Sequence, residues 1–173
     1  VSPLQRHFYK HNLKNGKKVQ ITKEHGTHGV TPSASGKYFI DSYSSTDVAR
    51  NVDIMDANGK YVNRLHEAVD PLKDYNIGTI ELGELKAEDG QTLYTRMIKP
   101  YNFDPNKKYP VIIYVYGGPH AQMITDEWTA GAGIYLHYLS QEGFIVFTLD
   151  NRGSADRGEA FEQVIHRQCG QAE

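Results

Sequence analysis

The strongest hydrophobic pattern in the chain is a continuous apolar and aromatic run at residues 111–116, which is too short for a core helix. A run of this kind, rich in β-branched residues, predicts a strand buried on both faces of a sheet. Residues 144–149 repeat the pattern, and Asp150 follows directly after them. Between the two runs, apolar residues at helical spacing predict a helix with one buried face: Trp128, Ala132, Tyr135, Leu136 and Leu139. Strand, helix and strand together predict a right-handed parallel crossover unit of an α/β sheet.

The first 68 residues show a different pattern, of short strands joined by turns. Two Asn-Gly-Lys turns, at residues 15–17 and 58–60, each lie between alternating apolar residues, and Asn-Gly is the pair that a tight hairpin turn favours. The turns are 43 residues apart, a spacing that fits one β-propeller blade. Residues 33–40 resemble the turn-and-strand signature of such repeats. We therefore expect about one and a half blades, with hairpins of an unrelated sandwich as the alternative.

The pattern changes at residues 70–75, where a proline and several charges interrupt the strands. We place a domain boundary there. Residues 79–99 then predict a further hairpin around an Asp-Gly turn, and residues 158–169 predict the start of another helix.

Composition excludes several classes of partner. The net charge is −2 and the chain has no run of lysines and arginines, so we expect no nucleic-acid partner. The longest apolar runs are far shorter than the roughly 20 residues that span a bilayer, so we expect no membrane segment in this chain. No signal peptide opens the sequence, which suggests that processing or the limits of the fragment removed what preceded Val1.

Metal-binding and redox residues are sparse. The single cysteine, Cys169, excludes an internal disulfide and a multi-cysteine zinc site, and we interpret it as a small residue in a helix rather than a reactive thiol. His7 and His11 fall in a predicted strand, roughly 13 Å apart and too far to share a metal. His25 and His28 fall in a glycine-containing loop with no further ligand. We therefore expect neither a metal nor a cofactor.

Three motifs carry a resemblance to a known family. They read Phe-Asp-Pro-Asn-Lys-Lys-Tyr-Pro at 103–110, Tyr-Val-Tyr-Gly-Gly-Pro at 114–119 and Leu-Asp-Asn-Arg-Gly-Ser at 149–154. Together they resemble the start of the catalytic domain of the prolyl oligopeptidase family, in its dipeptidyl peptidase IV-like branch. The resemblance implies the last blades of a β-propeller at residues 1–69. It also implies an α/β fold at residues 70–173, the N-terminal part of an α/β-hydrolase domain, ending before the nucleophile elbow.

The function that the resemblance implies is that of a serine exopeptidase, which hydrolyses peptides near their N-terminus after proline or alanine. Its partners would be peptide substrates. The complete protein would form a homodimer and would be periplasmic or extracellular. Two alternatives stay open: another α/β-hydrolase, such as an acylaminoacyl peptidase or esterase, and a non-catalytic propeller-type binding scaffold. The substrate-binding residues are unknown, because nothing in residues 1–68 matches the acidic pair that holds a substrate's amino terminus in this family.

The catalytic triad is not found in this sequence. A serine nucleophile on this fold needs Gly-x-Ser-x-Gly, and no serine in the chain has it. Ser154 follows Gly153, but Arg152 and Asp156 stand where flanking glycines are needed, so we interpret it as a loop serine. In this fold the acid of the triad normally comes after the nucleophile along the chain, so Asp150 comes too early to be that acid. We interpret Asp150 and Arg152 as a structural pair that fixes a loop. The resemblance places nucleophile, acid and base beyond this chain.

Tyr116 is the one candidate catalytic residue. The resemblance implies that its hydroxyl donates to the oxyanion, and a phenol held in a dry site is a strong donor toward developing negative charge. The alternative is a core aromatic residue whose hydroxyl reaches solvent. Gly117 and Gly118 would let the backbone turn tightly beside the scissile carbonyl. His120 receives no role.

Overall fold

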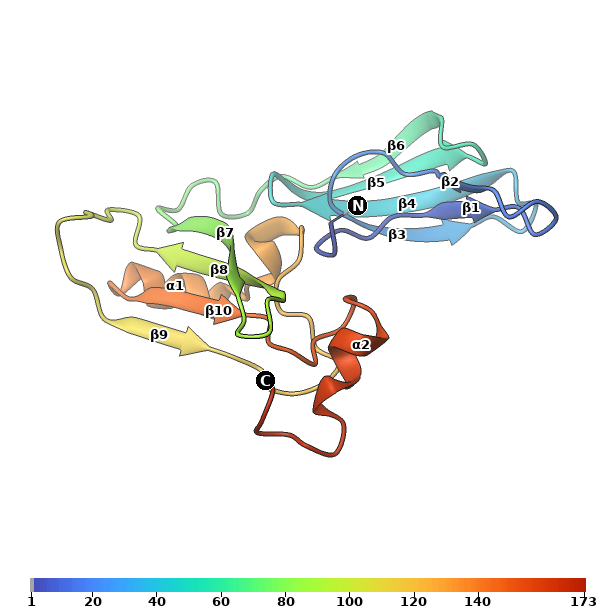
Figure 1. Cartoon of the computed structure of the whole chain (residues 1–173). Helices are drawn as coiled ribbons and strands as arrows, with labels where there is room; N and C mark the ends of the chain where they lie inside the picture. The colour runs from blue at the N-terminus through green and yellow to red at the C-terminus, as the bar shows by residue number, and fades with distance from the viewer. Residues whose placement is uncertain (1) are drawn as a thin grey trace. The chain divides into compact units, whose positions relative to one another are not determined.

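The computed structural model describes residues 2–173 and divides the chain into two compact units (Figure 1). The first unit contains the residues up to Pro71 together with Thr125–Trp128. The second unit contains Leu72–Ile124 and Thr129–Glu173. Four residues from the second half of the chain therefore belong to the first unit. The hydrophobic pattern of the sequence does not predict this.

The first unit is built from antiparallel strands. Its strands are β1 Tyr9–His11, β2 Lys18–Gln20, β3 Thr27–Pro32, β4 Tyr38–Ser45, β5 Val48–Asp56 and β6 Tyr61–Glu67. β1 and β2 form a two-stranded sheet, while β3, β4, β5 and β6 pair with their neighbours in chain order (Figure 1). A four-stranded antiparallel meander is the architecture of a propeller blade. The β1–β2 hairpin occupies the same place in the 43-residue period as the β5–β6 hairpin.

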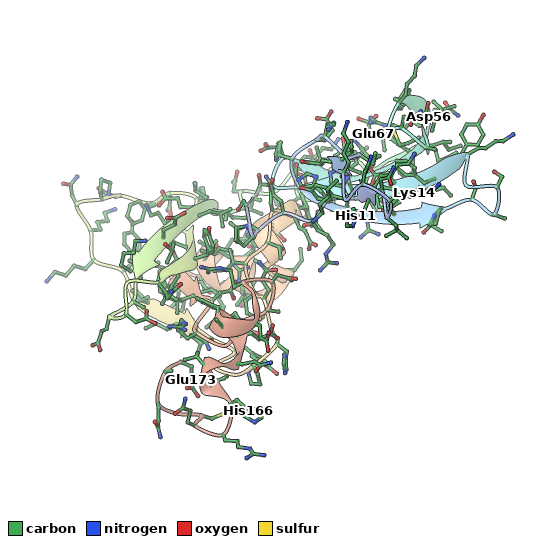
Figure 2. The ribbon with its side chains drawn as sticks, turned by 45° about the vertical axis from the view of Figure 1, so that its right-hand side comes forward. His11, Lys14, Asp56, Glu67, His166 and Glu173 are labelled. Atoms are coloured by element: carbon green, nitrogen blue, oxygen red, sulfur yellow. The ribbon has the colours of Figure 1, made fainter. Side chains whose placement is uncertain are left out.

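A hairpin forms around residues 57–60 as predicted, but its turn is not the tight primed Asn-Gly turn, because that turn needs positive φ at both residues and of the two only Gly59 has it. Gly59 has a φ of 84°, a value that glycine adopts without steric cost. The Asp56 carboxylate, labelled in Figure 2, accepts hydrogen bonds from the Asn58 amide at 2.8 Å and the Lys60 amide at 3.0 Å. These amide bonds lower the pKa of the Asp56 carboxyl. Local hydrogen bonds thus set the register of the β5–β6 hairpin.

The first hairpin differs from the prediction in its loop. His11 pairs with Lys18, so residues 12–17 form a six-residue loop in place of a tight Asn-Gly turn. The side-chain oxygen of Asn12 accepts the Lys14 amide at 2.9 Å, and the Gly16 amide donates to the Asn12 carbonyl at 2.9 Å. Figure 2 labels His11 and Lys14 on this hairpin. Asn12 competes for the backbone here, which ends β1 early.

The second unit contains the predicted crossover unit. Its elements are β7 Thr79–Lys86, β8 Thr92–Lys99, β9 Val111–Tyr114, α1 Ile134–Gln141, β10 Ile145–Leu149, α2 Glu159–Glu162 and a 3-10 turn Gln163–Ile165. The sheet has the order β7-β8-β10-β9, with β9 and β10 parallel and the other pairs antiparallel (Figure 1). The core lies where α1 packs on β8 and β10, around Ile98, Ala132, Leu136 and Val146. The hairpin at residues 79–99 and the parallel pair are both confirmed.

The prediction that residues 111–116 are buried on both faces is wrong. β9 covers only Val111–Tyr114 and is the edge strand of the sheet in the described part of the chain. Val111 is 56% exposed and Ile113 68% exposed. The reason is that α1 packs mainly on β8 and β10, while β9 lies at the edge of the sheet with a neighbouring strand on one side.

The predicted helix at residues 128–139 begins six residues late, at Ile134. Thr129 and Ala130 have φ values of 62° and 52°, and this left-handed backbone cannot continue a right-handed helix. Tyr135, expected on the buried face, is 67% exposed. A 3-10 turn, Trp128–Gly131, takes the place of the first helical turns.

The predicted helix at residues 158–169 is also shorter than expected. α2 is a single turn, and the 3-10 turn after it ends where His166 adopts extended backbone (φ −60°, ψ 120°). Figure 2 labels His166 in this C-terminal segment. Cys169 is exposed and lies beyond both turns, so the prediction that it sits in a helix is wrong. In the described part of the chain, no helix is long and apolar enough to cross a bilayer.

Candidate active site

Tyr116 follows the carboxyl end of β9, the end of a parallel strand where α/β proteins place functional groups. Its ring lies against Gly118: a β-carbon added to that glycine would be 3.1 Å from Cε1 of Tyr116. Gly117 has a φ of 68°, so the chain turns sharply directly after the tyrosine. Tyr116 is 59% exposed, so the described residues do not enclose it in the dry site expected from the sequence. The two glycines thus allow the backbone to fold closely around a tyrosine that stays accessible.

The loop after Tyr116 is tied to the loop after β10. The His120 amide donates to the Gly153 carbonyl at 3.1 Å, and the His120 ring contacts the Glu162 carboxylate. His120 has a φ of 65°, unusual for a residue with a side chain. The exposed His120–Glu162 contact contributes little stability, so the backbone bond is the firmer tie.

Asp150 anchors the same loop further along. Its carboxylate accepts the Met123 amide at 2.7 Å and the Ile124 amide at 3.2 Å. Asp150 is 4% exposed, and this burial raises the pKa of its carboxyl, although the two amide bonds act in the opposite direction. Asp150 is therefore a structural anchor between the ends of two parallel strands.

The prediction that Asp150 and Arg152 form a pair with each other is wrong. Arg152 instead forms an ion pair with Asp89 in the β7–β8 turn, and its guanidinium lies 4.9 Å from the centre of the Phe161 ring. The two residues fix different loops because their side chains leave the strand end in different directions. Spacing along the sequence could not reveal this.

Ser154 is a loop serine, as the sequence indicates. It is 2% exposed, and its hydroxyl donates to the Asn151 carbonyl at 2.7 Å. The hydroxyl is engaged within a turn and is not presented to solvent. This geometry offers no nucleophile.

Sequence reasoning missed Arg96, which is 0% exposed in the middle of β8. Its Nη1 donates to the Met123 carbonyl at 2.8 Å and to the Ala130 carbonyl at 2.6 Å, and its Nη2 donates to Oγ1 of Thr148 at 3.2 Å. The other charge of β8, Lys99, is at the end of the strand, so Arg96 is the one charge in its interior. That position is a usable signal, because a charge buried there must find acceptors.

His28 is on β3 and not in the loop predicted for it. Its Nδ1 lies 2.8 Å from Oδ2 of Asp41 and its Nε2 lies 2.9 Å from the Glu24 carbonyl. Both ring nitrogens face acceptors, which favours the doubly protonated imidazolium. Burial lowers the pKa of His28, but the bonds to Asp41 and Glu24 outweigh it, and the net pKa is raised. Protonation of His28 is therefore favoured by its two partners inside the first unit.

His7 also has a structural environment. Its ring lies beside that of His28, with 5.1 Å between ring centres and a tilt of 32° between the ring planes, and burial, followed by the interaction with His28, lowers the pKa of His7. Within residues 2–173, no group of three or more histidine, cysteine, aspartate or glutamate side chains is arranged to hold a metal ion.

We predict that the first unit loses stability as the pH rises through the raised pKa of His28. When the pKa of a histidine is higher in the folded state than in the unfolded state, protonation of that histidine stabilises the fold. This stabilisation is fully present below the unfolded-state pKa of about 6.5 and is lost as the pH rises above the folded-state pKa. Urea denaturation between pH 5.5 and pH 8.5 should show this loss in the wild type, and His28→Gln should remove it. His66→Gln, at an exposed histidine of β6, is the control that should keep it. An equal slope in wild type and His28→Gln would contradict the prediction.

Two family models match the chain. Residues 133–173 match the model described as the prolyl oligopeptidase family, and residues 1–50 match the dipeptidyl peptidase IV N-terminal region. The first match begins just before α1 and the second lies entirely in the first unit.

Curated relatives match over most of the chain. Dipeptidyl peptidase 8 of Mus musculus is 30% identical over 99% of this chain and 20% of its own length. A probable dipeptidyl peptidase 4 of Aspergillus flavus is 32% identical over 80% of the chain and 18% of its own length. The chain thus spans about a fifth of the length of the curated relatives it matches.

Solved structures show the same fold. Dipeptidyl peptidase 4 of Porphyromonas gingivalis matches with a TM-score of 0.89 and 30% identity, over 99% of this chain and 24% of that one. A putative dipeptidyl aminopeptidase IV from Bacteroides ovatus matches with a TM-score of 0.85 and 44% identity, over 91% of this chain and 23% of that one. The mostly β chain therefore resembles dipeptidyl peptidase structures from end to end.

Proposed function

The chain belongs to the prolyl oligopeptidase family, and from this membership we propose that the complete protein is a serine exopeptidase that releases dipeptides. It would act near the amino terminus of peptides, after proline or alanine, through a Ser-Asp-His triad beyond these 173 residues. The observation that carries the proposal is that two segments, in different units, match the two parts of one peptidase architecture.

We assign residues 1–69 to the end of a β-propeller and residues 70–173 to the N-terminal part of the hydrolase domain. The meander β3 to β6 supports the first assignment, because it has the strand order of a blade. The parallel β9–α1–β10 unit supports the second, because α/β-hydrolase sheets are built from such crossovers.

Within this function, Tyr116 would donate a hydrogen bond to the oxyanion. Its place at the carboxyl end of a parallel strand, beside two glycines, supports the role. A preorganised donor aimed at the developing charge is worth about 3–4 kcal/mol of transition-state stabilisation. Peptides would be the substrates.

A periplasmic or extracellular location and a homodimer complete the proposal for the whole protein. Both rest on the family resemblance. Cell fractionation would test the location, since activity confined to the cytoplasm would contradict export, and light scattering on the purified protein would test the dimer.

To test the function, the complete protein is given substrates with a free amino terminus and substrates with a blocked one, and their cleavage rates are compared. We expect cleavage of Gly-Pro chromogenic amide and at least a hundredfold slower cleavage of its acetylated form, because a site that hydrogen-bonds a free amino group rejects a substrate lacking it by up to about 10⁴–10⁵-fold. Cleavage of acetyl-alanine amide alone would favour an acylaminoacyl peptidase. No turnover of either would favour a binding scaffold.

A further inference from the structure

The backbone of Met123 is bonded on both sides by buried charged residues, through the two successive peptide groups that flank its Cα. Its amide donates to Asp150 at 2.7 Å, and its carbonyl accepts from Arg96 at 2.8 Å. Hydrogen bonds in which one partner is ionised are roughly twice as strong as neutral ones. Met123 is therefore firmly held within the loop that follows Tyr116. We call Arg96, Asp150 and the backbone of Met123 the clamp.

The clamp is costly for the fold. Arg96 is 0% exposed and Asp150 is 4% exposed, and Nε of Arg96 has no hydrogen-bond partner among the described residues. Burial lowers the pKa of Arg96 and raises that of Asp150, which shows that both charges are poorly solvated. Replacing buried charges by apolar residues of similar volume is often neutral or stabilising. Core stability alone therefore does not explain the clamp.

The clamp also closes the base of a loop. The second acceptor of Nη1 of Arg96 is the carbonyl of Ala130, so one guanidinium group joins residues 123 and 130. Between them lies Thr125–Trp128, the segment that belongs to the first unit. The chain leaves the second unit after Ile124 and returns to it at Thr129. Arg96 thus binds the backbone next to each of these two points.

The clamp is connected to Tyr116 through a short segment. Only residues 117–122 separate the two, and the bond from the His120 amide to the Gly153 carbonyl secures the middle of this segment. Tyr116 itself is 59% exposed and rests on Gly118, within the same loop. Its position therefore depends on how the loop is held, and catalytic groups must be held within about 0.5 Å.

We propose that Arg96 and Asp150 are positioning residues, which clamp the backbone of Met123 so that the loop holds Tyr116 in place for the oxyanion. This inference rests on the proposed function. It deepens that function by naming the buried pair on which the geometry of the donor depends.

The test uses Arg96→Met in the complete enzyme, alone and combined with Tyr116→Phe. Methionine keeps the aliphatic volume and removes every donor. We expect kcat to fall about tenfold to a hundredfold, the loss that a misplacement of about 1 Å can cause, with KM within about twofold. In the Tyr116→Phe background the same change should cost almost nothing, because the two residues would act through one interaction. Arg96→Lys, which keeps one charged donor, should recover part of kcat.

Arg64→Met is the matched control. Arg64 pairs with Asp53 at 2.8 Å in the first unit, so its loss removes an ion pair without touching the clamp. We expect it to lower the melting temperature and leave kcat unchanged. A rise in KM with unchanged kcat, or additive losses in the double variant, would overturn the clamp as a positioning device. So would insolubility of both Arg96 variants, which would make Arg96 a folding residue.

The outcomes separate the clamp from the proposed function. Wild-type enzyme without peptidase activity would overturn the proposed function. Full activity in Tyr116→Phe would overturn the role of Tyr116 and the clamp that acts through it. A slow Tyr116→Phe variant with additive losses would overturn the clamp alone.

Discussion

In the complete enzyme, Tyr116→Phe is expected to lower kcat about a hundredfold or more and to change KM little. The hydroxyl would meet the negative charge that develops on the oxygen in the transition state and is absent from the ground state, so its loss raises the barrier without weakening ground-state binding. Phenylalanine keeps the ring that rests on Gly118, so packing there is preserved. Steady-state kinetics on a Gly-Pro chromogenic amide, with matched thermal melts, measure the effect.

Tyr138→Phe is the matched control for this change. Tyr138 lies on α1 and is 51% exposed, so its hydroxyl is outside the proposed site. Both variants should melt within about a degree of the wild type, because the removal of an exposed hydroxyl has a small effect on stability. If kcat of Tyr116→Phe stays within a few-fold of the wild type at unchanged melting temperature, the tyrosine has no part in the mechanism.

The features that could be predicted from sequence are those decided by neighbouring residues. The β5–β6 hairpin follows from Asp56, which accepts two amides of its own turn, and from Gly59, whose backbone has positive φ. The parallel β9–β10 pair follows from two apolar runs with a helix-sized segment between them. In each case the decisive interactions lie within a few residues or within one hydrophobic run.

The features that could not be predicted depend on contacts between distant parts of the chain. Asp126 accepts the side-chain amide of Gln5 at 2.9 Å and the backbone amide of Thr46 at 3.2 Å. The amide of Trp128 donates to Oγ of Ser44 at 2.9 Å. These bonds draw four residues into the first unit, and the chain then needs left-handed backbone before α1 can begin. Helical periodicity cannot reveal such partners.

The same division applies to the candidate site. Tyr116 could be proposed because it stands within a motif that carries the family resemblance. Arg96 could not, because its acceptors are carbonyl groups 27 and 34 residues away, and a backbone carbonyl leaves no trace in the sequence. Its isolated charge within β8 is the only local indication.

The 173-residue chain, prepared alone, is expected not to hydrolyse Gly-Pro or Ala-Pro chromogenic amides above the uncatalysed rate. Peptide hydrolysis on this fold requires a nucleophile on an elbow, a histidine base and an orienting acid. No serine of the chain stands in that motif, and the hydroxyl of Ser154 is bound to the Asn151 carbonyl. Tyr116 alone could stabilise an oxyanion but could not form one.

The measurement is a long incubation of the purified chain with each amide, with contaminating protease excluded by mass spectrometry. Ser154→Ala is the matched control, because it removes the one serine that follows a glycine after a parallel strand. Turnover that disappears in Ser154→Ala would show that this serine is a nucleophile and would contradict the loop interpretation. Turnover that survives the substitution would require a nucleophile of another type. If the chain shows no turnover while the complete protein is active, the nucleophile, base and acid lie outside these residues. Tyr116 would then remain the candidate oxyanion donor within them.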